Sequence, residues 1–213
     1  MGDVMKKRHV SAIQAVLFDF DGTLTLPGAL DFPGIRAALG CPPGQPILEF
    51  IDSLKNPRAR QAAMDRLDDL ETAAAGRSMP NDGAEALIRW LRSQGLAMGI
   101  LTRNSRRSVV TALANFDGVA GQFDVIITRD DPLRPKPSGE GVLSAARKLD
   151  VKPVQMLVVG DFIFDCQAAR DAGAPCVLLD PADDPRLRSV DCDYRIRHLD
   201  EVKILLQTIG NSG

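Results

Sequence analysis

Short apolar runs that alternate with helix-like segments are the feature that most constrains the fold of this chain. The runs that read as strands are the one containing Val16 and those at residues 96–101, 125–127, 156–159 and 176–179. Between the later runs, apolar residues recur at intervals of three and four, which is typical of helices that bury one face. This alternation predicts a parallel sheet with helices on both faces, and therefore an α/β fold.

Polar residues and glycines mark where these helices are expected to begin and end. Asn81 or Asp82 suits the N-cap of the first helix, and Gly95 suits its C-terminal stop. Ser105 and Ser138 suit the N-caps of the next two helices. These signals support the assignment of the segments between the strands as helices.

Residues 27–79 depart from the alternation, because no strand pattern appears among them. Apolar spacing predicts a short helix near residues 35–39, a second at residues 47–54 and a longer third at residues 63–74. We therefore expect a small all-helical domain inserted after the first strand. The expected division is a core of residues 12–26 and 80–208 and an insertion of residues 27–79, with only the ends, residues 1–10 and 210–213, fraying.

The composition is that of an ordinary globular protein and argues against two classes of partner. Hydrophobic residues make up 45% and charged residues 25% of the 213 residues, enough to fill a core. The 26 basic and 28 acidic residues give a net charge of −2, so no basic field favours nucleic acid or an anionic membrane. No apolar run reaches the length of a membrane span. We expect neither nucleic-acid nor membrane partners.

The cysteines bear on the compartment in which the protein works. Cys41, Cys166, Cys176 and Cys192 show no CxxC spacing. They are expected to be reduced and mostly buried, as is typical of a cytoplasmic protein.

The residues that come directly after the apolar runs carry the chemistry of this sequence, because ligands bind beyond the carboxyl ends of the strands in open α/β sheets. Asp19 and Asp21 follow the first run, where charge is costly unless a cation or a reaction requires it. The other polar residues expected at this edge are Thr102, Lys136, Asp161 and Asp165. Convergent carboxylates without His or Cys suit Mg²⁺, and a lysine with a hydroxyl suits a phosphoryl group.

These segments resemble the four motifs of the haloacid dehalogenase (HAD) superfamily of phosphotransferases. The first motif is matched by Asp19-Phe20-Asp21-Gly22-Thr23, the second by Thr102, the third by Lys136 and the fourth by Gly160-Asp161 through Asp165. Their order and separations also match, over roughly residues 16–179. The resemblance implies a three-layer Rossmann-like core, a helical C1-type cap in the insertion, and the branch that includes phosphoglycolate phosphatase and β-phosphoglucomutase.

The resemblance also implies a role for each catalytic residue. Asp19 would attack phosphorus and become an aspartyl-phosphate. Asp21 would protonate the leaving alcohol and then take a proton from water. Thr102 and Lys136 would hold the oxygens of the transferring group.

Neighbouring residues are further candidates for binding phosphate and metal. Gly22 and Thr23 lie in a turn whose backbone N–H groups are expected to contact phosphate. Arg103 and Asn104 either bind substrate or cap the helix that follows them. The expected Mg²⁺ ligands are Asp19, the backbone carbonyl of Asp21, and Asp161, with Asp165 supporting the water shell of the metal or Lys136.

The expected function is Mg²⁺-dependent hydrolysis of the phosphomonoester of a small metabolite. A phosphomutase shares every motif residue and is the first alternative, and a non-catalytic regulatory binding module is the second. Phe162 stands where many family members have Ser, and it could narrow the mouth of the site. The cap residues Lys55, Arg58 and Arg60 are expected to be a solvated face. The sequence sets neither the metabolite nor the oligomeric state.

Overall fold

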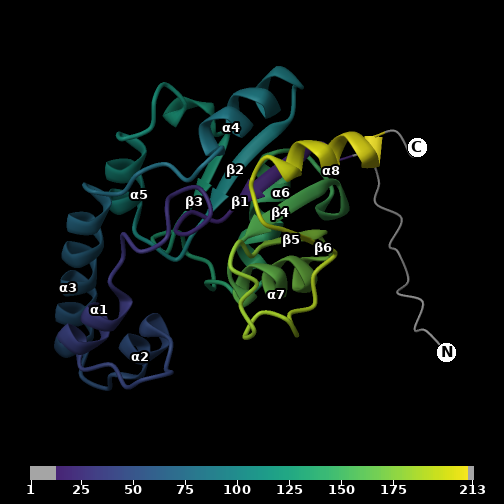
Figure 1. Ribbon diagram of the computed structural model, residues 1–213. Coiled ribbons are helices and arrows are strands. Elements are labelled where there is room, and N and C mark those ends of the chain that lie inside the picture. The colour runs from purple at the N-terminus through teal and green to yellow at the C-terminus, as the bar shows by residue number, and fades with distance from the viewer. Residues whose placement is uncertain (1–12, 211–213) are drawn as a thin grey trace.

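The computed structural model describes residues 13–210 and consists of a parallel sheet, helices on both of its faces, and a separate group of helices (Figure 1). The expected fraying of residues 1–10 and 211–213 lies outside the described residues. In chain order the elements are β1 (Ala15–Phe18), α1 (Phe32–Leu39), α2 (Ile47–Ser53), α3 (Pro57–Ala75), α4 (Ala84–Ser93), β2 (Ala97–Leu101), α5 (Arg106–Leu113), η1 (Ala120–Gln122), β3 (Val125–Ile127), α6 (Glu140–Lys148), η2 (Pro153–Gln155), β4 (Met156–Gly160), α7 (Ile163–Ala172), β5 (Cys176–Leu179), β6 (Tyr194–Ile196) and α8 (Glu201–Gly210).

The described residues form one six-stranded parallel sheet with the order β3-β2-β1-β4-β5-β6. Strand β1 lies inside the sheet, and its side chains alternate between two apolar clusters. Val16 and Phe18 pack with α4, α5 and α8, whereas Ala15 and Leu17 pack with α6 and α7. The predicted three-layer α/β architecture is therefore confirmed.

All five expected strands are present, but β6 and α8 were not predicted. Strand β6 is a three-residue edge strand with an exposed Arg195 in its middle, so it lacks a continuous apolar run. Helix α8 packs Val202 into the core cluster beneath it. Strand β6 lengthens the sheet beyond β5, and α8 covers part of one face of the sheet. Neither element carries a predicted site residue.

The start of α4 differs from the sequence prediction. Gly83, with a φ of 78°, is the N-cap of α4 in place of Asn81 or Asp82. The Asn81 side chain instead donates hydrogen bonds to the carbonyl oxygens of Gly22 and Thr23, at 3.3 and 2.9 Å. A tertiary contact thus outweighs the local cap, because the carbonyls of the turn after β1 need donors.

The other helix limits follow the sequence more closely. Ser105 caps α5 and accepts a hydrogen bond from the backbone N–H of Ser108, as predicted. Gly95 follows α4 with a φ of 71°, which confirms it as the stop. Helix α6 begins after Gly139 rather than Ser138, whose hydroxyl accepts from the backbone of Glu140.

Helices α1, α2 and α3 form a separate layer next to the carboxyl end of the sheet (Figure 1). They share a small apolar cluster that includes Ile35, Ile51 and Leu67, and α3 also packs on α5 of the core. The expected helices of residues 27–79 are all present, and no strand lies among these residues. The domain limits at residues 27 and 79 stay a prediction. We call these three helices the cap.

The cysteines differ from the prediction that all four are reduced. Cys166 at the start of α7 and Cys176 at the start of β5 form a disulfide, with 5.4 Å between their Cα atoms. Packing of α7 on β5 brings the two residues together across ten positions, so no CxxC spacing is needed. Cys41 and Cys192 are free. Within residues 13–210, no helix combines the length and the apolarity that crossing a membrane requires.

Candidate active site

The strand order brings the predicted site residues to one edge of the sheet. Asp19, Thr102 and Asp161 directly follow β1, β2 and β4, which are neighbours in the sheet. Lys136 comes from the loop between β3 and α6. All four residues line one cavity of about 520 Å³ between the sheet and the cap.

Lys136 is buried and is held by two carboxylates. Its Nζ donates to Oδ1 of Asp165 at 2.6 Å and also to Oδ1 of Asp19. These two partners raise the pKa of Lys136 although burial alone would lower it, so the ammonium stays charged. Asp165 also accepts from the backbone N–H of Phe162 at 3.0 Å and thereby caps α7. The structure thus shows Asp165 as a partner of Lys136, one of the two roles expected for it, and also as a cap of α7.

Three carboxylates form a group that fits a hard cation. One oxygen each of Asp19, Asp161 and Asp165 lies within 4.8 Å of the others, with no His or Cys in the group. Burial and the charge of Asp19 raise the pKa of Asp161 to about 8, and burial raises that of Asp165 to about 6. A divalent cation among these oxygens would favour their charged forms, and an all-oxygen donor set suits Mg²⁺.

The carboxyl group of Asp21 stands outside that group and has a different partner. The amide Nδ2 of Asn104 donates to its Oδ2 at 2.5 Å. Burial, followed by the charges of Asp19 and Glu71, raises the pKa of Asp21 to about 8. Burial therefore favours the protonated form of Asp21, which can donate a proton. Asn104 orients Asp21 and does not cap α5, since Ser105 does so.

The turn after β1 is shaped by a close approach of backbone to Asp161. Gly22 has a φ of 81°, and a Cβ atom there would lie 2.2 Å from Oδ2 of Asp161. Only glycine fits both the conformation and the space. Thr23 donates from its hydroxyl to Oδ1 of Asp161 at 3.3 Å, and Thr102 Oγ1 accepts from the backbone N–H of Asn104 at 3.2 Å.

Arg103, a predicted substrate-binding residue, is engaged by protein groups. It donates to Oε2 of Glu49 in α2 at 2.6 Å and to the backbone carbonyl of Lys136. Its guanidinium lies 5.1 Å from the ring centre of Phe164. Arg103 therefore connects the cap to the loop that carries Lys136.

A second arginine connects cap and core and was not predicted. Arg129, which follows β3, donates to Glu71 of α3 at 2.6 Å and also to Asp68. The side chains of Arg129 and Glu71 are only 5% and 7% exposed. Burial raises the pKa of Glu71 to about 7, although Arg129 acts to lower it. The acidic residues of α3 read as a solvated helix face, so no sequence signal marks this contact.

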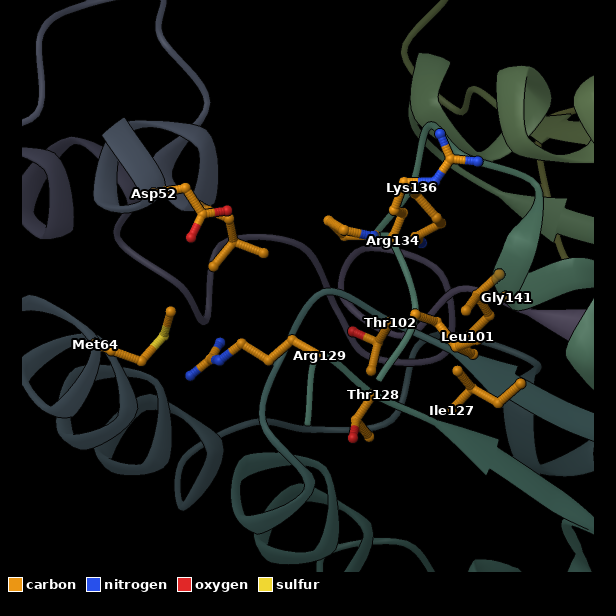
Figure 2. A pocket seen from close by; sticks show the side chains of 13 residues that line it. Asp52, Met64, Leu101, Thr102, Ile127, Thr128, Arg129, Arg134, Lys136 and Gly141 are labelled. Carbon is orange, nitrogen blue, oxygen red and sulfur yellow. The ribbon is translucent and has the colours of Figure 1, made fainter. Parts of the chain in front are cut away.

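A smaller cavity of about 190 Å³ adjoins the main one and shares Leu48, Thr102 and Lys136 with it. Figure 2 shows Asp52 and Met64 on its cap side, across from Thr102 and Lys136, with Arg129 extending toward Met64. The two cavities make one continuous site between the cap and the edge of the sheet.

The cap side of the main cavity is lined by different residues from those that the sequence singled out. Lys55, Arg58 and Arg60 are exposed and line neither of the two cavities, as expected for a solvated face. Arg36 of α1 lines the main cavity instead. Phe162 lies at this cavity with 51% of its surface exposed, in line with a residue at the mouth.

Comparisons with known proteins agree with this geometry. A model of the haloacid dehalogenase-like hydrolases matches residues 13–173. The chain is 38% identical to an uncharacterized hydrolase of Saccharomyces cerevisiae, over 78% of this chain and 77% of that protein. It is 32% identical to N-acetylmuramic acid 6-phosphate phosphatase of Pseudomonas aeruginosa, over 76% and 79% of the two chains.

Solved structures share the fold. A candidate phosphoglycolate phosphatase of Lactobacillus plantarum superposes with a TM-score of 0.76 at 22% identity, over 91% of this chain and all of that one. The family model spans most of the chain and includes all four motifs, so it confirms the resemblance seen in the sequence. The protein is an enzyme that belongs to the haloacid dehalogenase-like hydrolase family.

Proposed function

We propose that this hydrolase is a Mg²⁺-dependent phosphatase that cleaves the phosphomonoester of a small metabolite through an aspartyl-phosphate on Asp19. The observation that carries the proposal is that two carboxyl groups at the end of one strand have different surroundings. Asp19 is ion-paired with Lys136, whereas Asp21 has a pKa of about 8. Such a pair supplies a charged nucleophile and a protonated acid at the same pH.

In the first step, a carboxylate oxygen of Asp19 attacks phosphorus, and the bond from phosphorus to the leaving oxygen breaks. The carboxylic acid of Asp21 gives its proton to that oxygen, and the alcohol departs. The hydrogen bond from Asn104 holds the Asp21 carboxyl group in the orientation from which it would donate this proton. Lys136 and Thr102, which line the same cavity, would bind the oxygens of the transferring group.

In the second step, the Asp21 carboxylate takes a proton from water, and the water oxygen attacks phosphorus. Phosphate leaves and the Asp19 carboxylate is restored. Asp19, Asp161 and Asp165, with the backbone carbonyl of Asp21, would hold Mg²⁺, which neutralises negative charge on the phosphoryl oxygens when bound. The cap limits the access of bulk water to the site.

A small-metabolite substrate is supported by the size of the cavity under the cap and by the relatives. A cavity of about 520 Å³ under a cap has room for a small molecule. The names of relatives include N-acetylmuramic acid 6-phosphate phosphatase and phosphoglycolate phosphatase, which are phosphatases of small molecules. A cytoplasmic location stays a prediction of the sequence.

The experiment is hydrolysis of p-nitrophenyl phosphate with and without EDTA. Asp19→Asn should abolish turnover while the protein stays folded, and EDTA should abolish wild-type turnover in a way that added Mg²⁺ reverses. Asp82→Asn, at an exposed acid, is the matched control and should keep turnover. Turnover by Asp19→Asn would refute the nucleophile, and EDTA-insensitive turnover would refute the metal. Isomerisation of a sugar phosphate without release of phosphate would favour the phosphomutase alternative.

A further inference from the structure

The cavity contains one cation whose charge no carboxylate balances. Four cationic side chains line it among the described residues: Arg36, Arg103, Lys136 and Arg186. Arg103 is paired with Glu49, and Arg186 with Asp184. Lys136 is paired with Asp19 and Asp165. In the described part of the chain, Arg36 forms no ion pair and bonds only to neutral acceptors.

Arg36 is fixed in place by one end of its guanidinium. Its Nη1 donates to the carbonyl oxygens of Pro42 and Gln45 and to Sγ of Cys41, which lie in the loop between α1 and α2. The N–H groups of Nη2 and Nε have no acceptor within residues 13–210. Together they form the edge of the guanidinium that binds both oxygens of a carboxylate in the bidentate manner. Because the loop orders the side chain in advance, a ligand would lose little freedom in binding it.

The surroundings of Arg36 differ from those of the catalytic end of the cavity. On the cap side the lining includes Phe32, Pro46, Ile47 and Leu48, which are apolar. Across the cavity lie the carboxylates and Lys136, which bind metal and phosphoryl group in the proposed function. The main cavity is therefore lined by carboxylates and Lys136 at the edge of the sheet, and by Arg36 and apolar side chains on the cap side. A charge-assisted hydrogen bond is strengthened by apolar neighbours.

We propose that Arg36 determines specificity by binding a carboxylate on the leaving group of the substrate. The substrate class is then a phosphomonoester whose alcohol part carries a carboxylate. This inference rests on the proposed phosphatase function. It explains why an arginine of the cap is held by backbone carbonyls rather than by an acid: a protein carboxylate would compete with that of the substrate.

The test compares pairs of phosphomonoesters that differ in a carboxylate. The pairs are 2-phosphoglycerate against glycerol 2-phosphate, and 6-phosphogluconate against glucose 6-phosphate. For each pair the readout is the ratio of kcat/KM for the acidic member to that for the neutral member. Wild type should favour the acidic member of at least one pair. Arg36→Gln should lower that ratio roughly ten- to hundred-fold, mainly through KM, which is the range for loss of a charge-assisted hydrogen bond.

Two further variants separate charge recognition from a structural role. Arg36→Lys keeps the charge and should restore part of the ratio. Arg58→Gln removes an exposed cap arginine outside the cavity and should leave the ratio unchanged. If Arg36 only anchors its loop, Arg36→Gln will lower kcat/KM for both members equally, and the inference is wrong.

The role of Arg36 and the phosphatase function can be refuted separately. Wild-type hydrolysis of p-nitrophenyl phosphate without any preference for acidic members would overturn the role of Arg36 and leave the phosphatase function standing. Absence of phosphate release from every ester, p-nitrophenyl phosphate included, would overturn both.

Discussion

Replacement of Gly22 by alanine tests whether the turn after β1 lets Asp161 approach Asp19, the proposed nucleophile. The added Cβ would lie 2.2 Å from Oδ2 and 2.9 Å from Cγ of Asp161. The carboxylate must retreat by about 1 Å to regain van der Waals separation, and it breaks its hydrogen bond with Thr23. A shift of about 1 Å in a catalytic group lowers activity about 100-fold.

The cost in stability should be small, because the clash involves the mobile end of a side chain. The left-handed conformation costs alanine about 1–2 kcal/mol, and the stiffer unfolded chain offsets about 0.4–1 kcal/mol of this. The matched control is Gly118→Ala, since Gly118 has a φ of 66° and nothing within 4 Å of the new Cβ. Both variants should lose about 1 kcal/mol in urea unfolding.

The assay is p-nitrophenyl phosphate hydrolysis over a Mg²⁺ titration. Gly22→Ala should need more Mg²⁺ and should lose about 100-fold in kcat/KM. Gly118→Ala should match wild type in both quantities. The reasoning fails if Gly22→Ala keeps the wild-type Mg²⁺ dependence and rate, or if the two variants lose activity to the same degree.

Two further predictions concern buried charge. Lys136→Met leaves the carboxylates of Asp19 and Asp165 facing each other, so the metal-free protein should lose about 3–5 kcal/mol in urea unfolding, and Mg²⁺ should restore part of it. Stability unchanged by this substitution in EDTA would show that the lysine does not balance the acids. Glu71 has a folded pKa of about 7, above its usual 4.5, so its contribution to stability is full below about pH 4.5 and is lost as the pH rises through about 7. Glu71→Gln should therefore flatten the fall in stability between about pH 5 and about pH 8, and an unchanged slope in urea unfolding would contradict the shift.

The residues of the catalytic edge could be predicted because their placement follows from topology alone. Parallel strands end at the same edge, so residues that directly follow β1, β2 and β4 meet there whatever the loops do. The sequence pattern located those strands within a residue or two. The placement of Asp19, Thr102 and Asp161 at one edge could therefore be predicted from the positions of the strands alone.

The residues that face the site from the cap could not be predicted in the same way. Glu71 of the cap meets Arg129 of the core through a contact between segments that the sequence does not place relative to each other. Arg36 is positioned by the loop between α1 and α2, whose shape the helix pattern does not set. On its own helix, Glu71 is one acid among several, and only docking of α3 on α5 buries it. Asn81 is a second example, because its residue type suits an N-cap but its side chain donates instead to the carbonyl oxygens of Gly22 and Thr23.

The two arginines that join cap and core relate the position of the cap to the geometry of the site. Arg103 bonds at once to Glu49 in the cap and to the backbone carbonyl of Lys136. A cap that moved away would remove the acid from Arg103 and leave Arg129 without Glu71. The Arg103 side chain thus links the position of the cap to the loop whose lysine reaches Asp19. Contact of the cap therefore helps to hold Lys136, the proposed ligand of the phosphoryl oxygens, next to Asp19.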